Sequence, residues 1–290
     1  MNPLYRLAAI EWPLVACEEL LLGTAAFVLS VVPRDGNVRG RALRTFRPLW
    51  VALAAGVLVT TPLAMLAQVA QMADVSISGA IRFVPEAVAS TNAGFLWVCR
   101  IAGAVAIAAV AIMRSQPERA ASRLTMLVSA LFILEAFSSH AIDHGYAGVA
   151  IYFIHETAAG FWLGAIGGLL LMLTTEPDAP WLGDATRRVS AMIAWMVLAL
   201  GLSGVTMAYQ TLGASVARLV DTAYGRTLLA KIALFAIVLA IGAYNRYLIV
   251  PASDESAARK SLARTVGAEC VLLLAALVAA SMLANTPPPH

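Results

Sequence analysis

The chain has 290 residues, of which 60% are hydrophobic and only 13% are charged, with a formal net charge of +3. A soluble domain has about 45–50% apolar and about 25% charged residues, so this composition excludes an ordinary water-soluble protein. The small positive charge gives no reason to expect nucleic-acid binding, because the loops described below account for it. We therefore expect an all-α polytopic membrane protein.

Eight apolar segments follow one another, each close to the length of about 20 residues with which a helix crosses a bilayer. We place the spans at residues 12–32, 48–72, 92–113, 122–139, 148–174, 189–212, 227–250 and 265–285. They predict a bundle of eight transmembrane helices in a single domain, residues 1–290, because no long linker separates them. The first span is expected to be retained, since no small-residue cleavage site follows it. The connection at residues 73–91 predicts either a short interfacial helix or an ordered surface loop.

Basic residues are distributed unevenly between the two sets of connecting loops. Most of the twenty lie after the first, third, fifth and seventh spans: Arg34, Arg39, Arg41, Arg44, Arg47, Arg114, Arg119, Arg123, Arg187, Arg188, Arg246, Arg259, Lys260 and Arg264. Lys and Arg beside membrane spans stay on the cytoplasmic side. Because the number of spans is even, both termini are predicted to face away from the cytoplasm.

The fifth span carries a row of glycines. Gly160, Gly164 and Gly168 recur every four residues, so they lie on one face of the helix and let a neighbouring backbone approach closely. This helix is therefore expected to lie in the centre of the bundle.

Several ionisable residues lie inside the spans, where a charge is costly and indicates either a functional site or a buried pair. They are Glu18, Glu19, Arg100, Glu135, Glu156 and Lys231. All lie one to two helical turns below the non-cytoplasmic ends of their spans, so we expect them to form one polar layer. The alternative is that Arg100 and Lys231 only neutralise the glutamates in structural pairs.

Three of the four histidines fall within a short stretch around the fourth and fifth spans. If the fourth helix continues past Ser139, His140 and His144 share one face, and His155 lies about 10 Å lower on the next helix. Imidazole is the commonest protein ligand for metal ions. His140 and His155 are therefore candidate metal ligands, with His144 and the C-terminal His290 as less secure ones.

Carboxylates near these histidines are candidates for orienting the imidazole rings: Glu135, Asp143 and Glu156. Thioethers in the outer halves of two spans could add soft ligands: Met65, Met72 and Met207. Histidine with methionine favours Cu(I), and Zn²⁺ stays an alternative metal. Packing roles for the same side chains also stay open.

Two other classes of function are weighed against metal handling. A b-type haem with two axial histidines is disfavoured, because only His155 lies deep within a span. No Gly-rich phosphate loop is visible, so we expect neither ATP-driven transport by this chain nor enzymatic activity.

Five stretches of the second half carry a resemblance to a known family. They are "SSHA" (138–141), "HETAAGFWLGAIGGL" (155–169), "RRVSAMIAWMVLALGLSG" (187–204), "VDTAYGRTLLAKIALFAIVLAIGAYNRY" (220–247) and "AECVLLLAALVAASMLANTPP" (268–288). Over about residues 125–288 the chain resembles the CopD copper-resistance membrane protein family. The first three spans match that family only in hydrophobicity and topology.

The resemblance implies an eight-span protein of the bacterial inner membrane, with periplasmic termini, that moves copper ions inward. It also implies a periplasmic copper-binding partner of the CopC type, and it places the outer histidines of the family on His140 and His155. Two alternatives remain beside transport. One is a membrane metallo-redox or haem-associated protein, and the other is a copper-binding or assembly factor that does not transport.

The inner ends of the last two spans suggest a structural contact. Arg246 closes the seventh span where Glu269 begins the eighth, and antiparallel neighbours bring these two positions to the same depth. We therefore predict an ion pair between Arg246 and Glu269.

Overall fold

The structure is a computed structural model that describes residues 3–113 and 116–287. Within those ranges the chain is helical almost throughout and contains no β-strand. His290 lies outside the described residues.

Eight helices are long and apolar enough to cross a membrane, which confirms the predicted number of spans. They are α1 (Pro3–Ser30), α2 (Gly36–Met72), α5 (Asn92–Ile112), α6 (Pro117–Ser138), α7 (Gly145–Thr175), α8 (Leu182–Leu212), α10 (Ala223–Tyr244) and α11 (Ser256–Ala284). Shorter elements join them: α3 (Ile77–Ala80), η1 (Ile81–Phe83), α4 (Val84–Ser90), η2 (His140–His144), α9 (Val216–Asp221), η3 (Asn245–Ile249) and η4 (Val250–Ala252). The segment at residues 73–91 is thus largely helical.

The helices extend beyond the predicted spans mainly where the sequence is basic. α2 begins at Gly36, well before the predicted residue 48, because arginines lower the hydropathy of a segment without disfavouring a helix. Asp35 starts this helix as its N-cap, since its carboxylate accepts hydrogen bonds from the backbone N–H groups of Asn37 and Val38.

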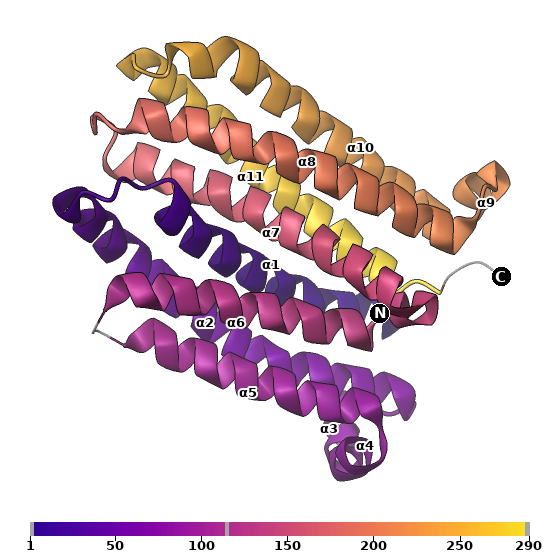
Figure 1. The fold of residues 1–290 in the computed structure, drawn as a ribbon. Helices are drawn as coiled ribbons and strands as arrows, with labels where there is room; N and C mark the ends of the chain where they lie inside the picture. The colour runs from indigo at the N-terminus through magenta and orange to yellow at the C-terminus, as the bar shows by residue number, and fades with distance from the viewer. Residues whose placement is uncertain (1–2, 114–115, 288–290) are drawn as a thin grey trace.

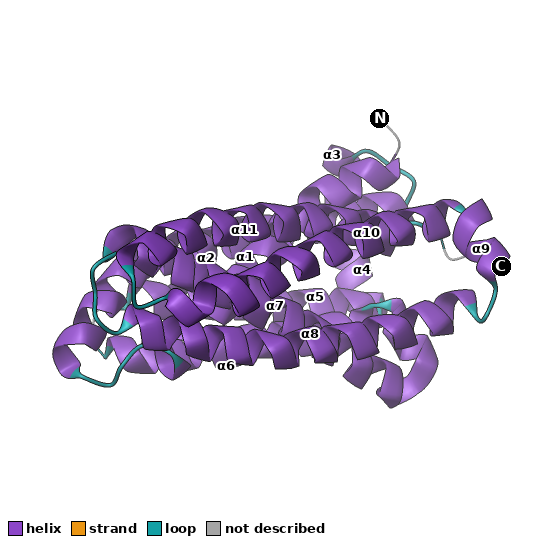
Figure 2. Cartoon of the chain, turned by 90° about the horizontal axis from the view of Figure 1, so that it is seen from above, coloured by secondary structure: helices purple, strands orange, loops and turns teal. Residues whose placement is uncertain are grey.

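The long helices run side by side, with α1 and α7 in the middle of the bundle (Figure 1). α2, α5 and α6 lie on one side of this central pair, and α8, α10 and α11 lie on the other. Seen from above, the axes of the long helices are nearly parallel or antiparallel to one another (Figure 2). Both ends of the chain lie at the same end of the bundle, together with α3, α4, α9 and η2, and we call it the terminal end. The opposite end, with Arg39, Arg41, Arg187 and Arg246, is the basic end.

The backbones of α1 and α7 touch at glycines. A Cβ atom added to Gly164 would lie 2.6 Å from the carbonyl carbon of Gly23 and 2.7 Å from the backbone nitrogen of Thr24. Next to this contact, the Phe27 ring packs on Gly168. The predicted glycine row therefore faces another helix, and α7 is central as expected.

Arg39 ties three helices together at the basic end. Its guanidinium donates hydrogen bonds to the carbonyl oxygens of Val28 and Leu29, at 3.1 and 3.3 Å, where α1 ends. It also pairs with Glu118 of α6 at 3.3 Å. A cation is favourable at the C-terminus of a helix, whose last carbonyl groups have no partner within the helix.

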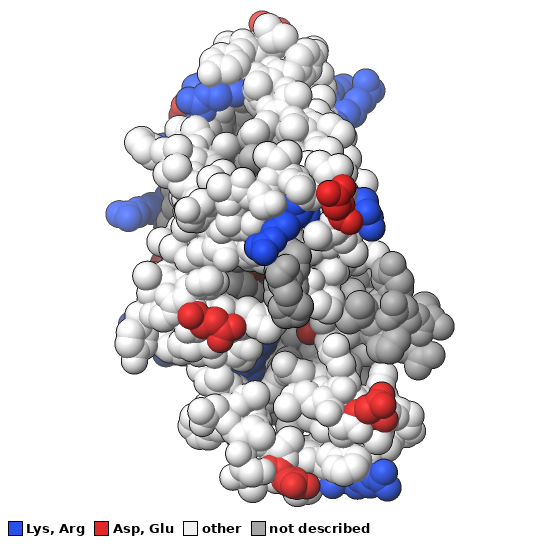
Figure 3. All heavy atoms as spheres, turned by 90° about the vertical axis from the view of Figure 1, so that its right-hand side faces the viewer, with Lys and Arg blue, Asp and Glu red and all other residues white. Residues whose placement is uncertain are grey.

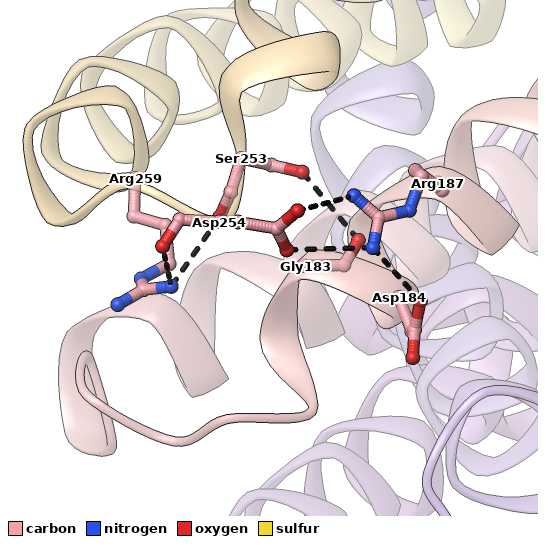
Figure 4. Close-up of polar contacts among 6 residues, drawn as sticks. All are labelled: Gly183, Asp184, Arg187, Ser253, Asp254 and Arg259. Atoms are coloured by element: carbon pink, nitrogen blue, oxygen red, sulfur yellow. Dashed lines mark hydrogen bonds and ion pairs between the residues drawn. The ribbon is translucent and has the colours of Figure 1, made fainter.

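A second polar cluster at this end joins the start of α8 to the turn before α11 (Figure 4). Arg187 lies between two carboxylates, 2.8 Å from Asp184 and 3.2 Å from Asp254. Arg259 donates to the backbone carbonyls of Ser253 and Asp254. These contacts hold the loop between α10 and α11 against α8.

The structure corrects the predicted ion pair between Arg246 and Glu269. Arg246 donates instead to the Ser190 carbonyl of α8 at 2.6 Å, and the partner of Glu269 is the Asn245 amide at 2.5 Å. Thr265 completes this buried group by donating to the Asn245 side-chain oxygen at 2.6 Å. Successive residues of a helix point about 100° apart, so only one of the two neighbours faces α11.

Candidate functional site

His155 is the buried histidine of the described chain, with 8% of its surface exposed. It lies on α7, about ten residues or roughly 15 Å from the start of that helix at the terminal end. Its Nδ1 atom lies 3.0 Å from the Ser203 hydroxyl of α8. The neighbouring Gly204 leaves room for the ring, because a Cβ there would come within 3.3 Å of Cε1.

The hydrogen bonds of Ser203 assign the tautomer of His155. The Ser203 hydroxyl donates its one proton to the carbonyl of Ala199, at 2.7 Å, so its oxygen is left to accept. With the Ser203 hydroxyl bonded in this way, we infer that Nδ1 of His155 carries the proton and donates it to Ser203. The lone pair of Nε2 is then available, which is the form of imidazole that binds a metal ion.

His140 has a different environment, at the surface of the terminal end. Its side chain is 84% exposed, and Nδ1 lies 3.3 Å from a carboxylate oxygen of Asp143. The predicted proximity of Asp143 to His140 is therefore present. Figure 3 views this end of the bundle, where scattered acidic and basic side chains interrupt a surface that is mostly neither.

The condition for a shared face of His140 and His144, a fourth helix that continues past Ser139, is not met. α6 ends at Ser138 and does not continue, and residues 140–144 form a 3₁₀ turn that the Ser139 hydroxyl begins by accepting from the Ala141 N–H. Such a turn has three residues in each repeat, so residue 140 faces residue 143 and not residue 144. His144 is exposed on another side of the turn.

The predicted histidines do not converge in this structure. Within the described ranges, no group of three His, Cys, Asp or Glu side chains is close enough to hold a metal ion. The structure instead separates an exposed pair, His140 with Asp143, from a single buried imidazole, His155. His290 contributes nothing to this comparison because it lies outside the described residues.

The three methionines occupy different places. Met65 is buried in the apolar core, and Met72 is exposed at the end of α2. Met207 is half-buried on α8, four residues after Ser203. Residues four apart share a helix face, so Met207 lies on the side of α8 that contacts His155, one turn nearer the terminal end.

Glu135 belongs to an ionic network with Arg100, and it has no hydrogen bond to a histidine of residues 3–113 and 116–287. One of its oxygens lies 3.3 Å from Arg100 of α5, and the other accepts from the Tyr152 hydroxyl at 3.2 Å. The Arg100 guanidinium also lies 4.7 Å from the centre of the Trp97 ring, and the indole N–H donates to Gln68. The structure therefore supports the pairing alternative for Arg100.

Ser203, Gly204 and Tyr152 are the residues of this region that the sequence analysis missed. Ser203 and Gly204 lie in the stretch that carried the resemblance, but a serine inside an apolar span has no signal of its own. Glu156 was expected near a histidine ring, and it is half-buried on α7 beside His155 in the chain.

Two family models match the chain, one in each half. The model described as "Copper resistance protein D" matches residues 183–283, and "Copper resistance protein D-like, N-terminal domain" matches residues 7–149. The second match includes the first three spans, in which the sequence analysis found only a likeness of hydrophobicity and topology.

Curated relatives point in the same direction. The chain is 28% identical over 220 residues to "Copper transport protein CutJ" of Bacillus subtilis, covering 71% of this chain and 39% of that protein. It is 26% identical over 273 residues to "Copper resistance protein D" of Pseudomonas syringae pv. tomato, covering 88% and 86% of the two chains. No solved structure matches the chain.

Proposed function

Since the chain belongs to the copper resistance protein D family, we propose that it transports copper ions across the membrane through His155. The chain is a multi-pass membrane protein of a copper-handling family, and these two facts support the proposal. The observation that carries it is the buried imidazole between α7 and α8, whose Nδ1 is bonded to Ser203 and whose Nε2 can accept a metal ion. The protein acts as a transporter and not as an enzyme.

The chemistry of the site favours Cu(I) as the transported ion. A single positive charge costs less to bring into a low-dielectric bundle than the double charge of Cu(II). Imidazole and thioether are suitable ligands for Cu(I), and Met207 lies one turn from Ser203 on the face that His155 contacts. We propose His155 with Met207 as the buried stage of the route.

The exposed pair of His140 and Asp143 is the proposed point of entry. An imidazole at the surface can accept an ion from a soluble carrier, and the Asp143 carboxylate holds its ring. The basic residues of the other end support an orientation with the terminal end outside, as expected in a bacterial inner membrane. A periplasmic protein of the CopC type would then deliver copper to His140, and copper would move inward.

Copper binding tests the assignment of His155. We expect detergent-purified His155→Ala to lose about one bound Cu(I) per chain under reducing conditions, because it lacks the buried imidazole. Ser203→Ala should bind Cu(I) about 10–100-fold more weakly, because Nδ1 loses the partner that fixes the ring. His144→Ala, which changes an exposed histidine of the same segment, is the control and should bind like the parent.

Unchanged Cu(I) stoichiometry in a folded His155→Ala variant would contradict the proposal. Copper uptake into reconstituted vesicles then separates transport from binding. Parent protein should carry Cu(I) across the bilayer, and His140→Ala should slow this uptake with little effect on binding at His155. Binding without uptake by the parent would identify a copper-binding or assembly factor.

A further inference from the structure

Two neighbouring glutamates of α1 are enclosed without adequate partners. Glu18 and Glu19 have exposed fractions of 0% and 1%. Both carboxylate oxygens of Glu18, and one of Glu19, have no hydrogen-bond partner among the described residues. Buried polar groups nearly always have such a partner, so these two carboxyls call for an explanation.

The charged groups around them come from every helix nearby. Arg100 of α5, Glu135 of α6, Glu156 of α7 and Lys231 of α10 act on one or both carboxyls. Glu11 of α1 interacts with Arg100 and Glu135, and Tyr152 of α7 lies beside Glu135. Two cations therefore face five carboxyl groups, and the region has an excess of acid.

Neither cation is free for Glu18 or Glu19. The Arg100 nitrogen that approaches Glu18 at 3.8 Å lies closer to Glu135, at 3.3 Å, where it donates a hydrogen bond. Lys231 is shared by Glu19 and Glu156, and it comes within 4.0 Å of neither in the part of the chain that the structure describes. Glu11 has a neutral partner, the Asn285 amide at 2.6 Å.

An unpaired carboxylate in such a place is neutralised. Enclosing an ion without a partner costs several kcal/mol even after relaxation, so the group binds a proton instead. A metal ion fits less well, because the side chains of adjacent helical residues point about 100° apart and cannot chelate one ion together. The backbones of α1 and α7 are also close here, since a Cβ added to Gly160 would lie 3.3 Å from the Cα of Glu19.

We propose that Glu18 and Glu19 form a proton-binding site within the bundle, and that a copper ion arriving at His155 displaces a proton from it. The copper part of this inference rests on the proposed function. Glu19 packs on Gly160 of α7, little more than one turn from His155. Lys231 acts on both His155 and Glu19, so a cation bound at His155 adds to the positive charge that the acid pair shares. An O–H bond of a carboxylic acid breaks, the proton leaves to water at the terminal end, and the carboxylate remains to balance the new charge. Copper entry and proton exit would thus be coupled.

Infrared spectroscopy of the copper-free protein tests the proton site by itself. At neutral pH the parent should show the carbonyl stretch of protonated carboxylic acids, and this band should lose intensity in Glu18→Gln and in Glu19→Gln. Glutamine keeps the shape and neutrality of a protonated glutamate, so both variants are expected to fold. Glu86→Gln, an exposed carboxyl of α4, should leave the band unchanged. The same band in the parent and in both buried variants would overturn the proposal.

Proton release during Cu(I) titration tests the coupling. In weakly buffered solution we expect the parent to release protons as copper binds. The double variant that combines Glu18→Gln and Glu19→Gln should bind copper and release fewer protons. His155 adds no proton to this signal, because its Nδ1 proton is held by Ser203. Equal release from the parent and the double glutamine variant would overturn the coupling. Absence of copper binding in every protein would refute the proposed function, and the infrared result would still decide the proton site.

Discussion

Replacing Gly164 by alanine is expected to separate α1 from α7 and to destabilise the protein strongly. The added Cβ would meet the backbone of Gly23 and Thr24, and backbone atoms cannot move aside as a side chain can. Overpacking of a core costs about 1–3 kcal/mol, and we expect the upper part of that range or more because two helices must shift. The loss should appear as a lower midpoint of thermal unfolding in detergent and a smaller monodisperse fraction.

Gly201→Ala is the matched control, since a Cβ on this residue of α8 would have no atom within 4 Å. Alanine favours a helix over glycine by about 0.5–1 kcal/mol, so this variant should be as stable as the parent or slightly more stable. If both alanine variants unfold at the same temperature, the close approach of α1 and α7 is not present in the protein.

Replacing Arg100 by leucine is expected to have an effect of similar size for an electrostatic reason. The change removes the cation next to Glu18, which is fully enclosed, and next to Glu135, which is half-buried. Breaking a buried pair by removing one partner costs about 3–5 kcal/mol. Thermal unfolding of the purified variant measures this loss.

A second variant distinguishes charge from packing at Arg100. Arg100→Leu combined with Glu135→Gln removes both members of the closest pair, so it should be more stable than Arg100→Leu alone. Arg218→Leu, which changes an exposed cation of α9, should lie within about 0.5 kcal/mol of the parent. Equal losses in the single and double variants would mean that the guanidinium acts through packing and not through its charge.

Most of the fold could be predicted because the thickness of the bilayer sets the number of apolar residues that a spanning helix needs. Because apolar length alone was used, the start of α2 was predicted too late: the helix begins at Gly36, although its first turns are not apolar. The central position of α7 was also predictable, since glycines four residues apart have few other uses inside a membrane helix.

The contacts of the site depended on information that a single sequence does not contain. The partner of His155 is Ser203, and the pairing depends on how α7 and α8 are aligned, which hydropathy does not reveal. Whether Asn245 or Arg246 faces Glu269 depends on how the end of the seventh span is rotated about its axis, which the sequence does not show. A shared face for His140 and His144 required α6 to continue past Ser139, and the 3₁₀ turn that follows Ser138 instead has no signal in hydropathy.

α1 is synthesised before most of the helices that enclose it. α1 precedes the other seven spans of this sequence and is the most enclosed of the eight, yet Gly164 and Arg100 are translated long after it. At about 5–20 residues per second, α1 waits on the order of ten seconds for its main neighbour α7. Before α7 is made, α1 with its two glutamates has only α2, α5 and α6 as neighbours within the chain. A nascent chain that ends before α7 therefore has the α7-binding face of α1 uncovered.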